Sequence, residues 1–492
     1  MLDEMLLITL LLVPFLAATL LLVARPDGTA RTIALLSSFI TAALAILLWV
    51  RYPGSNVTLL DLAWMPDWGL RFTVGYDGTG LLFLLLTALI FPFIIGAGRR
   101  EGADRPALVN ALLLFTQSAL FGVFMAQNAF LFYIFYELSL VPLFFLLLFW
   151  GSAVPGRLGS AKAVTMRFFI YTLLGGLALL FAIAYCVVQE PSHSADFNAL
   201  HALRLPGDVQ IWLFWALFLA FAVKLPIFPF HSWQPDTYTS APLQGTMVLG
   251  GVLLKMGLFG ILRFVLPIVP EGVEFWRSTV IWLALIGALY AGIIAFRQRD
   301  LKRLVAYSSL SHVGLLCAGL FAQNTYGISG SLYQAFAHAV LVVCMLYLVG
   351  AIQRRTGTTD LEAMGGLKHR APRLAALFFL VMLNAVALPL TQSFVGEWLM
   401  FNGLWQRDGW MAFAAVTTII LGAVYMLYAY QRVMLGPENA KLPLAGDADQ
   451  HDHLVLVPLI AVSLVLGVFP APVLNLLDGS VQQMLSTFTA LY

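Results

Sequence analysis

The chain has 492 residues, of which 61% are hydrophobic and only 11% are charged. Soluble domains usually carry about 25% charged residues, so this composition excludes an ordinary soluble protein. The formal net charge is only +2, which leaves the positions of the charges, rather than their sum, to carry information.

Apolar runs of about 20 residues, the length that a helix needs to cross a bilayer core, recur from one end of the chain to the other. The first run follows Asp3 and Glu4 and has no small-residue cleavage site behind it, so we expect a retained span rather than a signal peptide. We predict an all-α polytopic membrane protein with about fourteen transmembrane helices, at residues 5–24, 31–50, 79–98, 107–126, 129–150, 165–188, 209–230, 242–265, 278–296, 303–321, 328–353, 373–405, 410–432 and 454–476.

Two of the predicted spans are interrupted by proline. In the seventh, Pro226 and Pro229 follow directly after Lys224, and each removes a backbone donor. The twelfth is too long for one straight span and contains Pro389, which predicts two half-helices. Broken helices five spans apart are typical of transporters built from inverted repeats. We therefore expect an N-terminal three-helix segment, two inverted repeats of five helices with one broken helix each, and a C-terminal helix segment, at 1–106, 107–265, 266–435 and 436–492.

The positions of the lysines and arginines predict the orientation of the chain. If the N-terminus lies outside, the inner loops hold 19 of the 27 cations, Arg157 and Lys441 among them, and the outer loops hold only six. Because inner loops of membrane proteins are enriched in cations, both termini are expected on the outer face. The two remaining cations, Lys224 and Lys255, lie inside spans.

No long soluble domain interrupts the spans, and the largest loops are predicted at 51–78, 189–208, 354–372 and 433–453. The last of these loops is rich in aspartate and histidine and could form a weak metal site. A solvated loop is favoured, because no regular spacing organises its candidate ligands. These are Asp447, Asp449, His451, Asp452 and His453.

Four ionisable residues lie well inside apolar spans, namely Glu137, Lys224, Lys255 and Glu397. Each costs about 2.5–3.5 kcal/mol on insertion scales, so four such residues indicate a function or a set of structural ion pairs. A lysine suits proton transfer, since burial and a neighbouring carboxylate shift its pKa in opposite directions, whereas arginine stays charged. A static pair between Glu137 and Lys224 that only packs two helices is the alternative.

Histidines extend this set. His312 and His338 also lie within spans, and Ser309 and two further serines precede His312 closely. A single buried histidine is more often a satisfied core residue, but the neutral-range pKa of histidine suits a proton relay. His231 ends the stretch FLAFAVKLPIFPFHSW and is expected near the inner boundary.

Several segments together resemble a known family. The runs KLPIFPFHSWQPDTYTSAP, LLKMGLFGILRF and RDLKRLVAYSSLSHVG, with MGGL at 364–367 and SFVGEW at 393–398, are similar to signature segments of the antiporter-like subunits of respiratory complex I, NADH:quinone oxidoreductase. The likeness covers residues 77–475. The twelfth-span group in that family is usually lysine in the L- and N-type subunits and glutamate in the M-type, so Glu397 indicates the M-type, the counterpart of mitochondrial subunit four.

The resemblance implies a function. A subunit of this type translocates protons along buried lysine, glutamate, histidine and water, driven by quinone reduction in partner subunits. At the matching positions, Glu137 is the presumed partner of Lys224. The implied path enters from the inner face, runs through Lys224, Lys255 and His338, and leaves near Glu397 toward the outer face. His312 is a further central position, and His231, Tyr238 and Ser309 are secondary candidates. The family often has histidine where this chain has Tyr238, which weakens an uptake role there.

The resemblance also implies partners and location. This chain would hold no cofactor, while FMN, iron–sulfur clusters and quinone belong to partner subunits. Its neighbours would be the other membrane-arm subunits, especially the L- and N-type, together with lipids and no nucleic acid, in a bacterial inner membrane. The sequence has no dinucleotide fingerprint, phosphate loop or cysteine cluster.

Three further functions are open to such a chain. A subunit of a multisubunit cation/proton antiporter shares the fold and most motifs, but usually has lysine at the position of Glu397. A subunit of a related membrane-bound hydrogenase complex is a lesser possibility. A haem-bearing cytochrome would have to use His312 and His338, and a bundle that binds haem usually needs more than one facing pair.

Overall fold

The computed structural model describes residues 2–489 except 53, 55–56, 66–69, 101–103, 155–158, 440–441 and 444–445. Arg157 and Lys441, two of the cations counted as inner, lie outside the described residues. In the described part, thirteen helices are long and apolar enough to cross a membrane. The shorter α18 (Pro372–Ala385) and α19 (Gln392–Arg407) together supply the predicted twelfth span. The fourteen predicted spans are therefore confirmed as helical.

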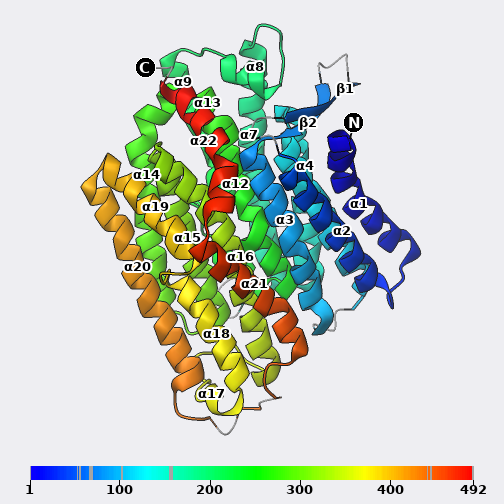
Figure 1. Ribbon diagram of the computed structural model, residues 1–492, viewed down its shortest axis with the longest axis vertical. Helices are drawn as coiled ribbons and strands as arrows, with labels where there is room; N and C mark the ends of the chain where they lie inside the picture. The colour runs from blue at the N-terminus through cyan, green and yellow to red at the C-terminus, as the bar shows by residue number, and fades with distance from the viewer. Residues whose placement is uncertain are drawn as a thin grey trace.

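The helices stand roughly side by side in one bundle (Figure 1). The first four spans are α1 (Leu2–Ala24), α2 (Ala30–Val50), α3 (Gly78–Ala97) and α4 (Pro106–Met125). The fifth to eighth are α5 (Ala129–Leu138) with α6 (Leu140–Trp150), α7 (Ala161–Gln189), α9 (Gly207–Lys224) with α10 (Gln234–Ser240), and α11 (Leu243–Val248), α12 (Leu254–Gly260) and α13 (Leu266–Ile268) in one run. The others are α14 (Pro270–Phe296), α15 (Leu301–Phe321), α16 (Thr325–Thr356), α18 with α19, α20 (Gly409–Tyr430) and α21 (Gln450–Val468), which α22 (Ala471–Thr489) follows. The short helices α8 (Phe197–Ala202), α17 (Leu367–Arg370) and η2 (Gly98–Arg100) lie between spans.

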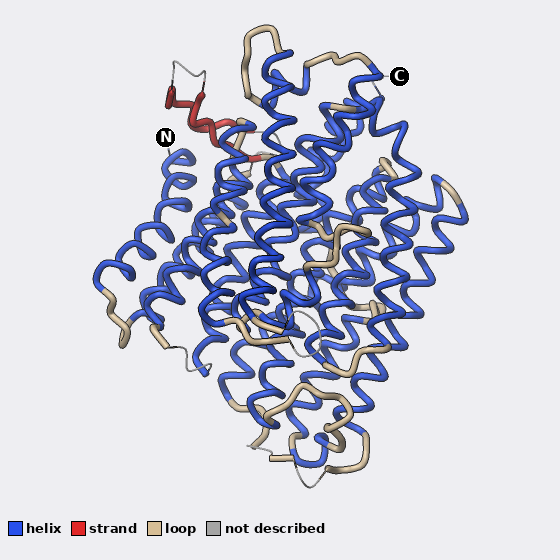
Figure 2. Tube along the Cα trace, turned by 180° about the vertical axis from the view of Figure 1, so that it is seen from behind, coloured by secondary structure: helices blue, strands red, loops and turns tan. Residues whose placement is uncertain are grey.

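Both termini lie at the same end of the bundle (Figures 1 and 2). We call this end, with residues 70–77 and 189–206, the terminal face, and the other end, with residues 297–300 and 357–371, the opposite face. The prediction of a loop at 51–78 was wrong in part. It contains an antiparallel hairpin of β1 (Val57–Met65) and β2 (Leu70–Tyr76), in which Val57 is opposite Tyr76 and Met65 is opposite Leu70.

Both predicted helix breaks are present. α9 ends at Lys224, and the chain forms turns until α10 begins. The Trp233 indole joins the two sides of the break, because it donates a hydrogen bond to the Val223 carbonyl of α9 at 2.9 Å. Between α18 and α19, Ala387 and Leu390 adopt positive φ values of 51° and 80°. Unwound backbone at this depth is tolerated where it is buried in protein or lines a wet cavity.

Three further interruptions were not predicted. Ser139 separates α5 from α6, and its hydroxyl donates to the Tyr136 carbonyl at 2.7 Å. The eighth span contains two π-helical turns, η3 (Leu249–Leu253) and η4 (Ile261–Val265). The predicted fourteenth span is interrupted as well, because α21 ends at Val468 and α22 begins at Ala471. The end of α21 lies beside the α18–α19 break, since a Cβ on Gly467 would lie 2.2 Å from the Leu390 carbonyl oxygen. The assignment of the two halves as inverted repeats stays a prediction.

On the terminal face, His201 of α8 is held against the end of the eighth span. Its Nε2–H donates to the Arg263 carbonyl at 2.9 Å, and the Arg263 guanidinium pairs with Asp77 at 2.6 Å. Burial, together with the positive charge of Arg263, lowers the pKa of His201 from 6.5 to about 4. Between these two pH values the unfolded chain binds a proton here that the folded chain does not.

We therefore expect the contribution of neutral His201 to stability to be fully present above pH 6.5 and to be lost as the pH falls toward 4. Through this group the free energy of unfolding should fall by at most about 1.4 kcal/mol for each pH unit. In the variant His201→Gln, which keeps an N–H donor, the melting temperature of the purified protein should fall less over this range. His193→Gln, in the same loop but exposed, is the control. An unchanged acid slope in His201→Gln would contradict the assignment.

Candidate functional site

Glu137 and Lys224 come from α5 and α9, and both helices pack against α7. Lys224 is 1% exposed, and its Nζ lies 4.8 Å from the centroid of the Tyr136 ring. The Tyr136 hydroxyl donates to the Ala220 carbonyl at 3.1 Å, one turn before Lys224. Neither Lys224 Nζ nor Glu137 Oε1 has a hydrogen-bond partner. The two charges therefore act on each other through space and not in a contact pair.

Lys255 lies in α12, directly after the π-helical turn η3. Its Nζ donates to the Gly250 carbonyl at 2.7 Å and lies 2.9 Å from His338 Nδ1 of α16. Lys255 is 1% exposed and His338 is 0% exposed. The turn η3 itself packs on α16, and a Cβ on Gly250 within it would lie 2.6 Å from Val342 Cγ1. π-helical turns of this kind are frequent at functional sites.

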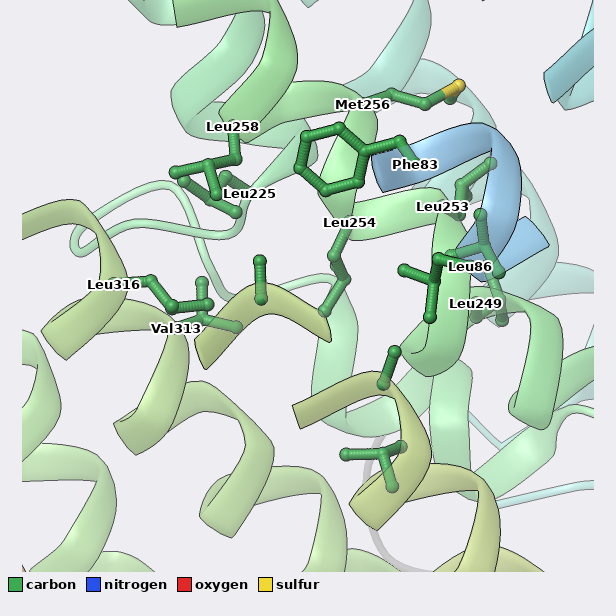
Figure 3. Packing of buried hydrophobic residues seen from close by; sticks show 14 of the residues in the cluster. Phe83, Leu86, Leu225, Leu249, Leu253, Leu254, Met256, Leu258, Val313 and Leu316 are labelled. Carbon is green, nitrogen blue, oxygen red and sulfur yellow. The ribbon is translucent and has the colours of Figure 1, made fainter. Parts of the chain in front are cut away.

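The surroundings of Lys255 are apolar. Figure 3 shows that the adjoining residues Leu253, Leu254 and Met256 pack among the side chains of other spans, including Phe83 and Val313. A charged ammonium group in such surroundings is costly unless polar groups compensate it. Among the described residues, only a carbonyl and an imidazole nitrogen do so.

His312 and Glu397 form the second contact of the site. His312 Nδ1 of α15 lies 3.2 Å from Glu397 Oε1 of α19, and the His312 and His338 rings are 5.8 Å apart between centroids. A cavity of about 10 Å³ touches His312, Glu397 and Tyr425, which is close to the space that one water needs. These distances place four ionisable side chains in one series, in which each lies close to the next: Lys255, His338, His312 and Glu397.

The structure does not connect all the predicted residues. Lys255 Nζ contacts Gly250 and His338, and Lys224 Nζ has no hydrogen-bond partner among the described residues, so no direct polar contact joins the two lysines. Gly257 beside Lys255 instead packs on Leu225, which follows Lys224. Transfer between the two lysines would need water or side-chain movement in this apolar region.

The secondary candidates lie toward the opposite face. The His231 ring contacts the rings of Phe228 and Tyr290, each at 5.5 Å between centroids, and lines a cavity of about 570 Å³ that also touches Arg303. Tyr238 is 0% exposed and lies beside Gln234 and Ser309. Tyr238 also flanks Gly250, which places it near Lys255.

One residue of the site was missed by the sequence analysis. Gln334 lies on α16 one turn from His338, is 0% exposed, and has no hydrogen-bond partner for either amide atom. A buried amide of this kind usually binds an ordered water. An amide in the otherwise apolar run QAFAHAVL was a signal that could have identified it.

Comparisons with known proteins show the family to which this chain belongs. Residues 126–422 match the family described as NADH:quinone oxidoreductase/Mrp antiporter, transmembrane, and this range contains all six ionisable candidates. The chain is 35% identical over 474 residues to NADH-quinone oxidoreductase subunit M of Rickettsia bellii, with 94% of each chain covered. It is 32% identical over 482 residues to NADH-ubiquinone oxidoreductase chain 4 of Marchantia polymorpha, with 96% of each covered.

The fold agrees as well. A chain in the structure of respiratory complex I from Thermus thermophilus with bound NADH superimposes with a TM-score of 0.88 at 29% identity, over 97% of this chain and 99% of that chain. The predicted resemblance, including the mitochondrial counterpart, is confirmed. The chain thus belongs to the NADH:quinone oxidoreductase/Mrp antiporter transmembrane family, among the subunit M proteins of NADH-quinone oxidoreductase.

Proposed function

We propose that this chain translocates protons as a membrane-arm subunit of NADH:quinone oxidoreductase. The observation that carries the proposal is the buried series Lys255, His338, His312 and Glu397, with contacts of 2.9 Å at one end and 3.2 Å at the other. Buried ionisable residues inside spans mark proton relays. Each of these four groups can both accept and release a proton, as a relay requires.

Each residue has a separate task in this proposal. Lys255 takes up a proton and passes it to His338 across their direct contact. His312 accepts it and delivers it to the Glu397 carboxylate, beside a cavity with room for a water. Glu137 changes the charge that Lys224 experiences, since the two interact through space. A proton that arrives on Glu137 or leaves it therefore shifts the protonation of Lys224.

The redox chemistry belongs to partner subunits in this proposal. FMN, the iron–sulfur clusters and quinone would reside there, and the L- and N-type subunits would be the immediate neighbours in the membrane arm. The three cysteines of this chain are free and buried, and each lies in a different helix. The cation distribution favours an orientation with the terminal face outside, and in that orientation protons would be taken up at the opposite face.

Substituting Glu137 in the assembled enzyme tests the relay. Glu137→Gln keeps the shape of the side chain but cannot carry the negative charge, so we expect proton pumping per NADH oxidised to fall about fivefold or more, a loss of roughly 1 kcal/mol in coupling. Pumping is measured in inverted membrane vesicles with a pH-sensitive dye. Glu274→Gln, at the surface of the terminal face, is the control. Undiminished pumping in Glu137→Gln would exclude the assigned role.

The matching family also includes Mrp antiporter subunits, so a cation/proton antiporter subunit is the second candidate. Glu397 disfavours it, because its carboxylate contacts His312 where the antiporters usually carry lysine. Purification of the native complex separates the two functions. Copurification with flavin- and iron–sulfur-containing subunits supports the first, and a complex without them supports the second.

A further inference from the structure

Two adjacent glycines on α7, Gly175 and Gly176, lie where this helix meets the two helices that carry the first charged pair. Gly175 faces α9, where a Cβ would lie 3.4 Å from the Ala220 Cα and carbonyl oxygen and 3.5 Å from Val223 Cβ. These are ordinary van der Waals distances. A methyl group at this position therefore fits without movement.

Gly176 faces Glu137 of α5 and differs sharply from its neighbour. A Cβ at Gly176 would lie 1.7 Å from Glu137 Oε1, 2.7 Å from Cδ and 3.4 Å from Oε2. The three nearest heavy atoms thus all belong to the carboxyl group of one side chain. The Glu137 carboxylate occupies the space that any other amino acid at position 176 would fill.

We propose that Gly176 is a positioning residue for Glu137, an inference that rests on the proposed relay. Its missing side chain forms a notch in α7 that receives the carboxylate and sets its distance from Lys224. Glu137 Oε1 has no hydrogen-bond partner that would hold it there. The shape of the notch and the attraction of Lys224 are therefore what fix the carboxylate.

A methyl group at position 176 would displace the carboxylate and leave the helix packing intact. Real Cβ contacts stay beyond 3.0 Å, so Oε1 has to move until its distance grows from 1.7 Å to that limit. The Glu137 side chain is partly exposed, so we expect it to turn away from α7. The Coulomb energy between two charges falls with their separation, and most steeply at low dielectric constant. Lys224 would then experience a weaker and differently placed negative charge.

The experiment compares Gly176→Ala with the matched control Gly175→Ala in the assembled enzyme. Both changes replace a helical glycine by alanine and therefore bring the same backbone stabilisation. We expect Gly175→Ala to pump protons like the unsubstituted enzyme. Gly176→Ala should assemble in equal amount but pump at least about twofold fewer protons per NADH, a change of roughly 0.4 kcal/mol. Equal pumping by the two variants would overturn the proposal.

Rescue by a shorter carboxylate separates positioning from a packing defect. Glu137→Asp retracts the carboxyl group by one methylene and removes the clash with a methyl at position 176. Gly176→Ala should therefore lower pumping in the Glu137 background but change it little in the Glu137→Asp background, as a double-mutant cycle measures. An equal loss in both backgrounds would show that the glycine supports packing alone.

The proposed function and this inference fail in different ways. Normal pumping by Glu137→Gln removes the relay role and with it the inference. Loss of pumping in Glu137→Gln, combined with normal pumping in Gly176→Ala, keeps the relay and rejects only the positioning role. A folding defect would lower the amount of assembled complex, which is measured on the same membranes by gel electrophoresis.

Discussion

Replacing Lys255 by methionine is expected to lower the number of protons pumped per NADH about tenfold or more in the assembled enzyme. This corresponds to a loss of roughly 1.4 kcal/mol or more in coupling. Methionine is similar in volume and unbranched, so the buried site stays filled. The variant leaves the Gly250 carbonyl and His338 Nδ1 without the ammonium group that contacts them at 2.7 and 2.9 Å. Lys224, the other lysine inside the spans, has no hydrogen-bond partner in the described part of the chain, so it contacts neither of these two groups.

Lys255→Arg separates a proton-carrying role from a purely electrostatic one. Arginine keeps the positive charge but cannot release its proton, so it should pump as poorly as methionine. Lys368→Met, at an exposed position of α17, is the control for loss of a lysine. Both quantities, NADH oxidation and dye quenching in vesicles, are measured together. Substantial pumping by Lys255→Arg would show that a fixed charge is enough, and the relay through Lys255 would have to be abandoned.

The spans of the fold could be predicted because each is a local property of about 20 consecutive residues. The breaks at Pro226 and Pro389 could be predicted for the same reason, since proline acts on its own helix. The π-helical turn before Lys255 could not. It lies where Gly250 packs closely against Val342 of α16, a contact between residues far apart in the sequence that no local pattern reveals. The hairpin of β1 and β2 likewise depends on pairing between two short segments.

The candidate residues could be chosen from the sequence, but their contacts could not. The cost of burying charge singles out Glu137, Lys224, Lys255 and Glu397 wherever they pack. Which of them meet is decided by tertiary structure, and the expected partner of Lys224 is not in contact with it. The direct contacts involve the histidines instead. Gly176 carries no chemical group, so nothing in the sequence could mark it as part of the site.

The second large effect concerns stability at the opposite face. Asp452, at the start of α21, is 0% exposed and pairs with Arg355 at the end of α16. Its other oxygen accepts a hydrogen bond from the Tyr347 hydroxyl at 2.9 Å, and Arg354 lies 3.8 Å away. Asp452 also completes the capping box of α21 with Asp449. One carboxylate therefore anchors α21 to the largely buried α16, and the acidic loop that could have been a metal site serves as this anchor.

Asp452→Ala is accordingly expected to destabilise the folded chain by about 3–5 kcal/mol, because it leaves the buried Arg355 without its carboxylate. Arg355 keeps its bonds to the Asp447 and Ala351 carbonyls, which places the loss toward the lower end of that range. The free energy is measured by unfolding the purified protein in mixed detergent micelles. Asp449→Ala, which removes only the N-cap, should cost about 1 kcal/mol.

A second substitution distinguishes an unpaired charge from lost packing. If the buried guanidinium causes the loss, Arg355→Met in the Asp452→Ala background should restore part of the stability, because a buried ion pair can be replaced by apolar residues at little cost. If the carboxylate acts mainly through Tyr347 and the cap, the double variant should be no more stable than Asp452→Ala. Equal stability of Asp452→Ala and Asp449→Ala would show that α21 is held by its apolar face, with the ion pair contributing nothing beyond the cap.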